Sequence, residues 1–332
     1  MNPKIEQFRG IKRKISGVLL LDKPPRVSSN QALQIAKRIF TASKAGHTGT
    51  LDPLATGLLP ICFGEATKFS SALLGADKTY EATLRLGYIS TTGDAEGEIS
   101  VAGEAPPQDW KLTPPQIETV LKSFTGVITQ VPPMYSALKH QGKPLYTYAR
   151  EGMEIERQPR KVIIYGLRME ALAGDEMRIA VKCGTGTYVR TLAEDIGKAL
   201  GCGGAYLTAL RRSILDDFDL SQSYTLDVLE AMPAAQRDAC LRPADSLLHD
   251  LPAAILDDAA VVSLLQGRPV KSGFSGEGLD NLADLAEGEK IRLYDQQKRF
   301  LGLGEIKAPG EIAPKRLIGI SECILRGALI DQ

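Results

Sequence analysis

Apolar residues follow a strand-like spacing in several segments of the chain. Ile15–Leu21 is a continuous apolar run that predicts a buried strand, ending at a proline-fixed turn in Asp22–Pro25. Every second residue of Lys78–Gly87 is apolar from Tyr80 onward, which indicates a strand with one buried face. Two further strands are expected, at Ile163–Leu172 and Met177–Cys183.

Three other segments show the apolar spacing of an amphipathic helix. They are Gln31–Phe40, Thr113–Phe124 and Thr191–Leu200. Ser28 to Asn30 are expected to cap the first helix, and Pro114 lies in the first turn of the second. Because strands and helices are mixed without regular βαβ alternation, the pattern favours an α+β fold over a doubly wound sheet.

The composition changes after Arg212, which predicts two domains. Asp216–Asp250 carries eight Asp and Glu against two Arg, and it is interpreted as an acidic connector. Short apolar segments punctuated by glycine follow from about Leu251, and they predict a small β-rich barrel. The expected domains are residues 1–250 and 251–332, and strands are expected in the second at Gln266–Val270, Ile291–Tyr294, Phe300–Gly304 and Arg316–Ile320.

The overall charge is balanced, with 40 Lys and Arg against 40 Asp and Glu in 332 residues. This balance excludes a polycation, so affinity for nucleic acid requires basic residues gathered on one face. Ser136–Lys161 has six Lys and Arg against three Glu, and Lys182–Arg212 has five against two acidic residues. Together with Arg9 and Lys12–Lys14, these segments are expected to form a basic surface opposed by the acidic connector.

Cysteine and histidine spacing argues against disulfides and metal centres. The five cysteines, including Cys323, are scattered and form no C-x-x-C pair, which is typical of a reducing, cytoplasmic compartment. The three histidines are too far apart for the usual zinc spacings, so no metal is expected. The longest uncharged stretch, Ser123–Leu138, contains polar residues and two prolines and is not expected to span a membrane. The basic N-terminus lacks the apolar core of a signal peptide.

Gly46–Gly57, with the sequence GHTGTLDPLATG, combines glycines, a histidine, a carboxylate and a proline in one short segment and is the first candidate for a catalytic loop. Pro53 fixes its own φ angle and holds the preceding residue, Asp52, in an extended conformation. A lone carboxylate aimed in this way is suited to catalysis. The alternative is that Asp52 only shapes a turn.

A second signal is CGTGTYVRTL, Cys183–Leu192. We expect a strand end here, with Tyr188 and Arg190 on one face because side chains two apart on a strand point the same way. A buried arginine beside a carboxylate keeps it ionised and oriented, whereas a surface ion pair is the alternative for Arg190. Val189 stands where a dinucleotide fingerprint needs its last glycine, so no such cofactor is expected.

Taken together, six segments resemble the bacterial tRNA pseudouridine-55 synthases. They run in the family's order from Gly17 to about Ser213: GVLLLDKP, AGHTGTLDPLATGLLPICFGEATK, DKTYEATLRLG, VPPMYSALKHQGKPLYTYAREG, CGTGTYVRTLAEDIG and LRRS. The resemblance implies a mixed, largely antiparallel sheet core with helices, followed by a small PUA-like RNA-binding domain. It also implies conversion of the T-loop uridine at position 55 of tRNA to pseudouridine at the T-arm elbow, with no cofactor, no metal and no obligate protein partner. A monomer is expected.

The same resemblance assigns roles to individual residues. Asp52 is implied to be the nucleophile, and Arg190 its ion-pair partner. Tyr80 is implied to stack on the target uracil, with its phenol placed to assist proton removal. The remaining assignments are His47, which replaces the base flipped out of the RNA stack, Tyr188 and Leu210, which line the uracil pocket, and Lys23, which supports the core near the site.

Two positions depart from the family pattern, and other functions stay open as alternatives. Thr50 stands where alanine is common, and Thr185 where lysine or arginine is common, which removes one expected phosphate contact. An RNA-folding chaperone would use the same basic face without any particular carboxylate. A pseudouridine synthase acting on another RNA would share most of the motifs, and an enzyme that also helps tRNA to fold would combine two of these activities.

Overall fold

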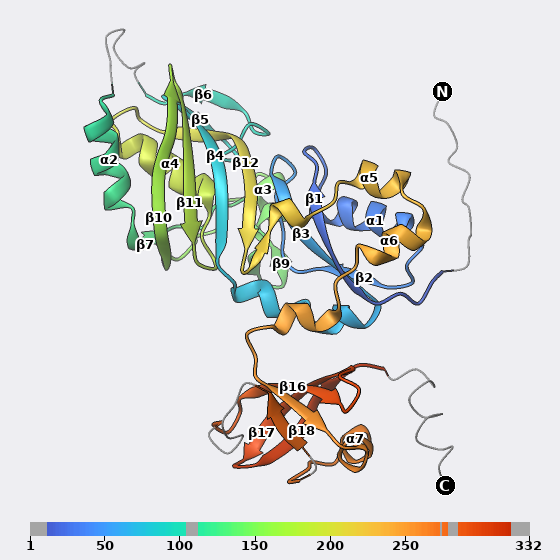
Figure 1. The fold of residues 1–332 in the computed structure, drawn as a ribbon. Helices are drawn as coiled ribbons and strands as arrows, with labels where there is room; N and C mark the ends of the chain where they lie inside the picture. The colour runs from blue at the N-terminus through green and yellow to red at the C-terminus, as the bar shows by residue number, and fades with distance from the viewer. Residues whose placement is uncertain (1–11, 104–111, 273, 278–284, 320–332) are drawn as a thin grey trace.

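The computed structural model describes residues 12–103, 112–272, 274–277 and 285–319; Arg9, Ile320 and Cys323 lie outside this part. A large sheet with helices is followed by a separate small sheet (Figure 1). The strands of the large sheet are β1 (Gly17–Lys23), β2 (Ala45–His47), β3 (Thr56–Phe63), β4 (Lys78–Leu86), β7 (Gly126–Gln130), β10 (Arg160–Ala173), β11 (Glu176–Cys183), β12 (Ala205–Leu215) and β13 (Phe218–Asp219).

The large sheet is mixed and largely antiparallel. Its main order is β1-β3-β12-β4-β11-β10-β7, with β2 on β3 and β13 on β12. The pairing of β12 with β3 is parallel, and the other pairs in this sheet are antiparallel. The predicted α+β class with a largely antiparallel core is confirmed. Two small hairpins lie outside the sheet, β5 (Tyr88–Ser90) with β6 (Ile99–Val101), and β8 (Lys139–His140) with β9 (Lys143–Pro144).

The three predicted helices are present. They are α1 (Ser29–Ile39), α2 (Pro114–Ser123) and α4 (Val189–Ala199), and α1 begins with a capping box between Ser28 and Gln31. In Figure 1, α2 and α4 cover one face of β4, β11 and β10, while α1 lies beside β1 and β3. The further helices are η1 (Gly64–Phe69), η2 (Ala72–Gly75), α3 (Leu145–Arg150), η3 (Leu220–Gln222), α5 (Leu226–Ala231), α6 (Ala234–Ala239), η4 (Ala244–Leu248) and α7 (Asp258–Leu265).

Alternation along β4 builds the core beneath the site. Tyr80, Ala82, Leu84 and Leu86 are buried, as their spacing predicts. They belong to one apolar cluster with the buried face of α4, which includes Leu192 and Ile196. The strand that carries Tyr80 is therefore fixed by packing along its whole length.

The acidic segment 216–250 differs from the expected connector. It folds into β13, η3, α5, α6 and η4 and packs against β1, where Val18 and Arg242 exchange two backbone hydrogen bonds of 2.8 Å. Arg13 forms an ion pair with Asp238. Asp238 of the acidic segment thus neutralises Arg13 of the N-terminal basic run, and the wider opposition of acidic and basic surfaces stays a prediction.

The second sheet has the order β15-β14-β16-β17-β18. Its strands are β14 (Ala253–Leu256), β15 (Phe274–Glu277), β16 (Lys290–Asp295), β17 (Phe300–Ala308) and β18 (Glu311–Leu317). The expected strand at Gln266–Val270 is wrong. Gln266 caps α7, Gly267 turns the chain at φ +80°, and only Val270 pairs, in a single bridge with Ile312.

The two sheets are joined by direct contacts. Lys68 of η1 donates a 2.9 Å hydrogen bond to Leu317 O, and Arg316 donates a 2.7 Å bond to Lys68 O. Tyr294 donates a 2.7 Å bond to the Asp245 carboxylate. These bonds fix the small sheet against the base of the larger unit.

β3 and β12 approach each other closely at Gly57, and a substitution there tests this contact. It has φ +96°, and a Cβ there would lie 2.3 Å from Arg212 O, whereas Gly174 has φ +61° with open space around it. Gly57→Ala should therefore lower the free energy of unfolding by at least about 2 kcal/mol more than Gly174→Ala, since only the first adds a backbone clash to the left-handed strain. Urea denaturation of both variants checks this, and equal losses would contradict it.

Candidate active site

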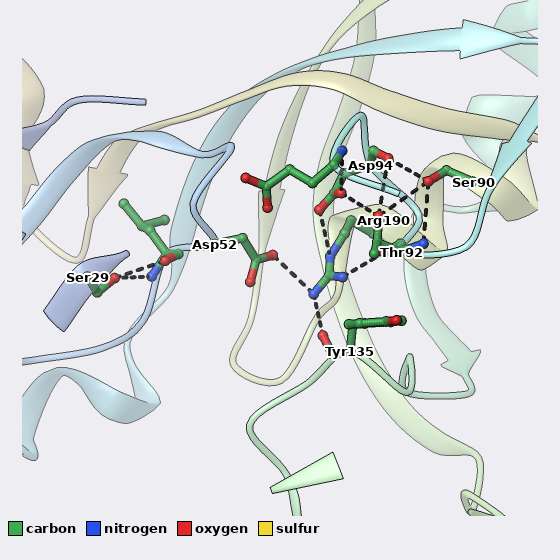
Figure 2. Close-up of polar contacts among 9 residues, drawn as sticks. Ser29, Asp52, Ser90, Thr92, Asp94, Tyr135 and Arg190 are labelled. Atoms are coloured by element: carbon green, nitrogen blue, oxygen red, sulfur yellow. Dashed lines mark hydrogen bonds and ion pairs between the residues drawn. The ribbon is translucent and has the colours of Figure 1, made fainter. Parts of the chain in front are cut away.

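The loop that carries Asp52 is pinned by the start of α1. Ser29 Oγ donates to Leu51 O at 2.9 Å and accepts from Leu51 N at 2.8 Å (Figure 2). Pro53 O accepts a 2.9 Å bond from Arg26 N. The residues on both sides of Asp52 are thus held by backbone bonds, which leaves its side chain a restricted direction.

Arg190 meets Asp52 from the opposite side of the cleft. Arg190 Nη2 lies 3.1 Å from Asp52 Oδ2, and the arginine is 6% exposed. Nη1 donates to Thr92 O and Nη2 to Tyr135 O, each at 2.7 Å (Figure 2). The structure thus brings together Asp52 and Arg190, and the guanidinium is fixed by loops from three different segments.

A second carboxylate, Asp94, lies behind the arginine and was missed in the sequence. It is 2% exposed, and its Oδ2 is 3.9 Å from Arg190 Nε. Its other oxygen accepts bonds from Thr92 Oγ1 at 2.6 Å and Glu96 N at 3.1 Å. The signal was present in STTGDAEG, where an Asp among Ser, Thr and Gly favours side-chain to backbone bonds.

The Asp52 carboxyl group faces a cavity of about 370 Å³. Its side chain is 38% exposed and is paired with Arg190. Partial burial raises the pKa of Asp52, and the charge of Arg190 opposes the rise. A carboxylate that is poorly hydrated and anchored on one oxygen is suited to nucleophilic or electrostatic chemistry.

Tyr80 and Leu210 line the same cavity, together with Arg212. Tyr80 and Arg212 are direct cross-strand partners on β4 and β12. Burial raises the pKa of the Tyr80 phenol, while the positive charge of Arg212 opposes the rise. Arg212 is 1% exposed and donates a 2.7 Å bond to Leu58 O. It was missed as a site residue, although in LRRS the alternation of β12 turns one of the two arginines inward.

Lys23 lies beneath the Asp52 loop and is fully buried. Its ammonium donates to Val27 O at 2.7 Å, Pro24 O at 2.9 Å and Pro53 O at 3.3 Å. Burial lowers the pKa of Lys23 to about 8, and the charge of Asp52 opposes the decrease. The lysine therefore ties β1 to the residue that follows Asp52.

His47 lies on the other side of the catalytic loop. It lines a second cavity of about 650 Å³, to which Asp52, Arg190 and Tyr135 also contribute. Burial lowers the pKa of His47, which favours the neutral ring at neutral pH. His47 thus shares this second cavity with Asp52 but does not line the 370 Å³ cavity.

The expected strand end at Tyr188 and Arg190 was wrong. β11 ends at Cys183, Tyr188 precedes the first residue of α4, and Arg190 lies in the first helical turn. Gly186, at φ +84°, interrupts the extended backbone, so the two side chains do not alternate as on a strand. Both still line the 370 Å³ cavity.

The expected basic surface is smaller than the residue count suggests. In Lys182–Arg212, Arg190 and Arg212 are buried at the site, and Arg211 pairs with Asp22 at 2.7 Å. Three of the five positive charges therefore serve internal contacts. Lys139 and Lys143 of the β8–β9 hairpin are exposed and remain available to a ligand.

Possible metal ligands converge at one place among the described residues. Asp216, Asp217 and His249 lie within reach of one another, with His249 Nε2 2.8 Å from Asp217 Oδ2. Asp216 is partly buried, Asp217 and His249 are exposed, and none of the three lines the 370 Å³ cavity. No helix in the described part of the chain is long and apolar enough to cross a membrane.

Comparisons with known proteins agree on one family. Residues 37–189 match the TruB family pseudouridylate synthase N-terminal domain, 190–249 the tRNA pseudouridylate synthase B C-terminal domain, and 252–318 the pseudouridine synthase II TruB C-terminal domain. The tRNA pseudouridine synthase B of Nitrosospira multiformis is 67% identical, covering 95% of this chain and 99% of that protein. That of Nitrosomonas europaea is 53% identical over 93% and 98%.

A solved structure shares the fold. In the crystal structure of the archaeal box H/ACA sRNP Nop10-Cbf5 complex, one chain matches with a TM-score of 0.67 and 23% identity, over 91% of this chain and 86% of that one. The fold and the matched domains define a pseudouridine synthase, which is an isomerase. Within that class, the chain belongs to the TruB family.

The lowered pKa of Lys23 predicts how the free energy of unfolding depends on pH. Between about pH 8 and its ordinary pKa of 10.5, Lys23 has lost its proton in the folded chain but keeps it when unfolded. Raising the pH through this window should therefore stabilise wild type relative to Lys23→Met, by up to about 3 kcal/mol. Urea titrations from pH 7.5 to 10.5 measure the difference, with Lys122→Met at an exposed lysine as the control. A difference that falls with pH would contradict the burial argument.

Proposed function

We propose that this protein converts the T-loop uridine at position 55 of tRNA to pseudouridine, with Asp52 as the nucleophile. The observation that carries the proposal is the Asp52–Arg190 ion pair at the bottom of a cavity lined by Tyr80 and Leu210. The names of the relatives, tRNA pseudouridine synthase B, support tRNA as the substrate. The position within tRNA rests on the resemblance of the motifs.

The chemistry explains why one carboxylate is enough. The bond between N1 and the ribose C1′ must break, the uracil must rotate, and C5 must then bond to C1′ and lose its proton. Both a covalent adduct at C1′ and a glycal intermediate begin with a carboxylate beside the ribose. Arg190 keeps one Asp52 oxygen anchored, and the other remains open to the cavity.

Tyr80 is proposed to stack on the uracil and to assist removal of the C5 proton. Its ring lies on the cavity wall, and the cavity also has an apolar contribution from Leu210. The positive charge of Arg212 favours any negative charge that develops on the phenol oxygen. Tyr188, which lines the same cavity, would complete the uracil pocket.

His47 is proposed to fill the gap that the flipped uridine leaves in the RNA stack. Extruding a stacked base costs on the order of a few kcal/mol, which a replacement side chain and pocket stacking must offset. The neutral, half-buried His47 ring lies in the neighbouring cavity with Asp52 on its wall. This arrangement supports entry of the RNA loop from the His47 side.

We also propose that the two domains have different roles. Residues 1–250 would form the catalytic domain, and residues 251–332 a PUA-like domain that binds RNA outside the cleft. The match of residues 252–318 to a TruB C-terminal domain supports this boundary.

Asp52→Asn tests the nucleophile. The amide keeps the size of the side chain but lacks the charge, so pseudouridine formation on a tRNA transcript should fall below detection while the Kd for tRNA stays within a few-fold. Nucleoside chromatography and filter binding provide the two measurements. Equal losses of binding and turnover would mean that Asp52 is structural.

Tyr80→Phe separates stacking from proton transfer. The variant keeps the ring and loses the hydroxyl, so we expect tRNA affinity near that of wild type and a turnover rate lowered about 10²- to 10⁴-fold, the range of general acid–base catalysis. Single-turnover rates at saturating tRNA measure the effect. Full activity would remove the proposed role of the phenol.

A further inference from the structure

The turn that joins β11 to α4 ends at Tyr188 and leads into the helix that carries Arg190, without an ordinary side-chain cap. It runs from Gly184 to Tyr188, and the Tyr188 side chain makes no capping bond to the helix. A helix start in this state leaves backbone N–H groups free and its first residues poorly fixed. Thr185 Oγ1 donates to Leu74 O and Thr187 Oγ1 donates to Gly184 O, each at 3.0 Å, and further contacts come from the edge of the large sheet.

Gln130, the last residue of the edge strand β7, holds the Tyr188 backbone. Its Oε1 accepts a 3.1 Å bond from Tyr188 N, and its Nε2 donates a 3.3 Å bond to Tyr188 O. Gln130 is 1% exposed, so these bonds are shielded from water. The side-chain amide thus fixes the backbone two residues before Arg190.

Arg160 holds the Tyr188 ring. It is the first residue of β10 and the direct cross-strand partner of Gln130. Its guanidinium carbon lies 4.9 Å from the centre of the Tyr188 ring, and the guanidinium also donates a hydrogen bond to Gly186 O. Gly186 has φ +84°, a backbone conformation that favours glycine, and it brings the carbonyl that accepts from Arg160 into the turn.

We propose that Arg160 is a positioning residue, which holds the Tyr188 ring on the cavity wall through a cation–π contact. It acts together with Gln130. The edge of the sheet thereby fixes the positions of Tyr188 and of the start of the helix that carries Arg190. This inference rests on the proposed function, because it requires Tyr188 to line the uracil pocket.

The segment that follows this edge strand also contacts Arg190. After Gln130 the chain passes through Val131, Pro132 and Pro133 to Tyr135, whose carbonyl oxygen accepts from Arg190 Nη2. The Gln130–Arg160 pair is thus continuous with a second support of the catalytic ion pair. Arg160 itself also lines the 370 Å³ cavity, so the test has to separate positioning of Tyr188 from direct contact with the RNA.

The test compares chemistry with affinity in the full-length protein. Single-turnover rates at saturating T-arm hairpin, and the Kd of that hairpin, are measured for wild type, Arg160→Gln, Arg160→Lys, Tyr188→Leu and the Arg160→Gln/Tyr188→Leu double variant. Arg168→Gln, at an exposed arginine of the same strand paired with Glu170, is the matched control. Melting temperatures establish that each variant is folded.

We expect Arg160→Gln to lower the rate about 3- to 30-fold, as loss of a partly desolvated cation–π contact predicts, with a Kd within two-fold of wild type. Arg160→Lys should not restore the rate, since its ammonium lacks the planar face that covers the ring. The double variant should be no slower than Tyr188→Leu alone, and Arg168→Gln should match wild type.

Two results would overturn the inference while wild type is active. One is a loss of affinity in Arg160→Gln that lysine restores at an unchanged rate, which would make Arg160 a phosphate contact. The other is a rate in the double variant that falls by the product of the two single-variant losses. Such a result would show that Arg160 and Tyr188 act independently. A wild-type protein that modifies no tRNA hairpin contradicts the proposed function, and this inference with it.

Discussion

A buried guanidinium determines the shape of the active-site cleft. Arg190 is almost fully withdrawn from water, and an unpaired charge there would cost several kcal/mol. Its partners come from separate segments: the Thr92 and Tyr135 carbonyls and the Asp52 and Asp94 carboxylates. Pairing the arginine therefore fixes three loops relative to α4, and with them the direction of the Asp52 side chain.

At Asp52 and three residues near it, burial disfavours the charged form of the side chain. Burial raises the pKa of Asp52 and of Tyr80, and it lowers the pKa of Lys23 and of His47. Poor hydration weakens the folded state locally but strengthens each electrostatic contact made inside the cleft. The surrounding apolar cluster, which contains Tyr80 itself, supplies the stability that this arrangement requires.

Much of the fold could be predicted from the sequence where one periodicity dominates. The alternation of β4 and the apolar stripe of α4 each had a single interpretation, and both elements are present. Asp94 and Arg212 were missed because their partners are distant in the sequence. The turn before α4 was misread because Gly186 ends the extended pattern, and the acidic segment was misread because its charge count concealed the apolar residues, such as Leu229, that pack it onto the core. The Asp52–Arg190 pair came from the family resemblance rather than from spacing.

Tritium release from a T-arm hairpin labelled at C5 of its uridines tests the central claim most directly, because it reports loss of a C5 proton and a cytidine substitution then assigns the position. The account predicts one equivalent of tritium released per hairpin by the wild-type protein, and none when cytidine replaces the uridine at position 55. Undiminished release from the cytidine hairpin would place the reaction at another uridine. Tight binding without release from either hairpin would contradict the account and favour another RNA substrate or an RNA-folding role.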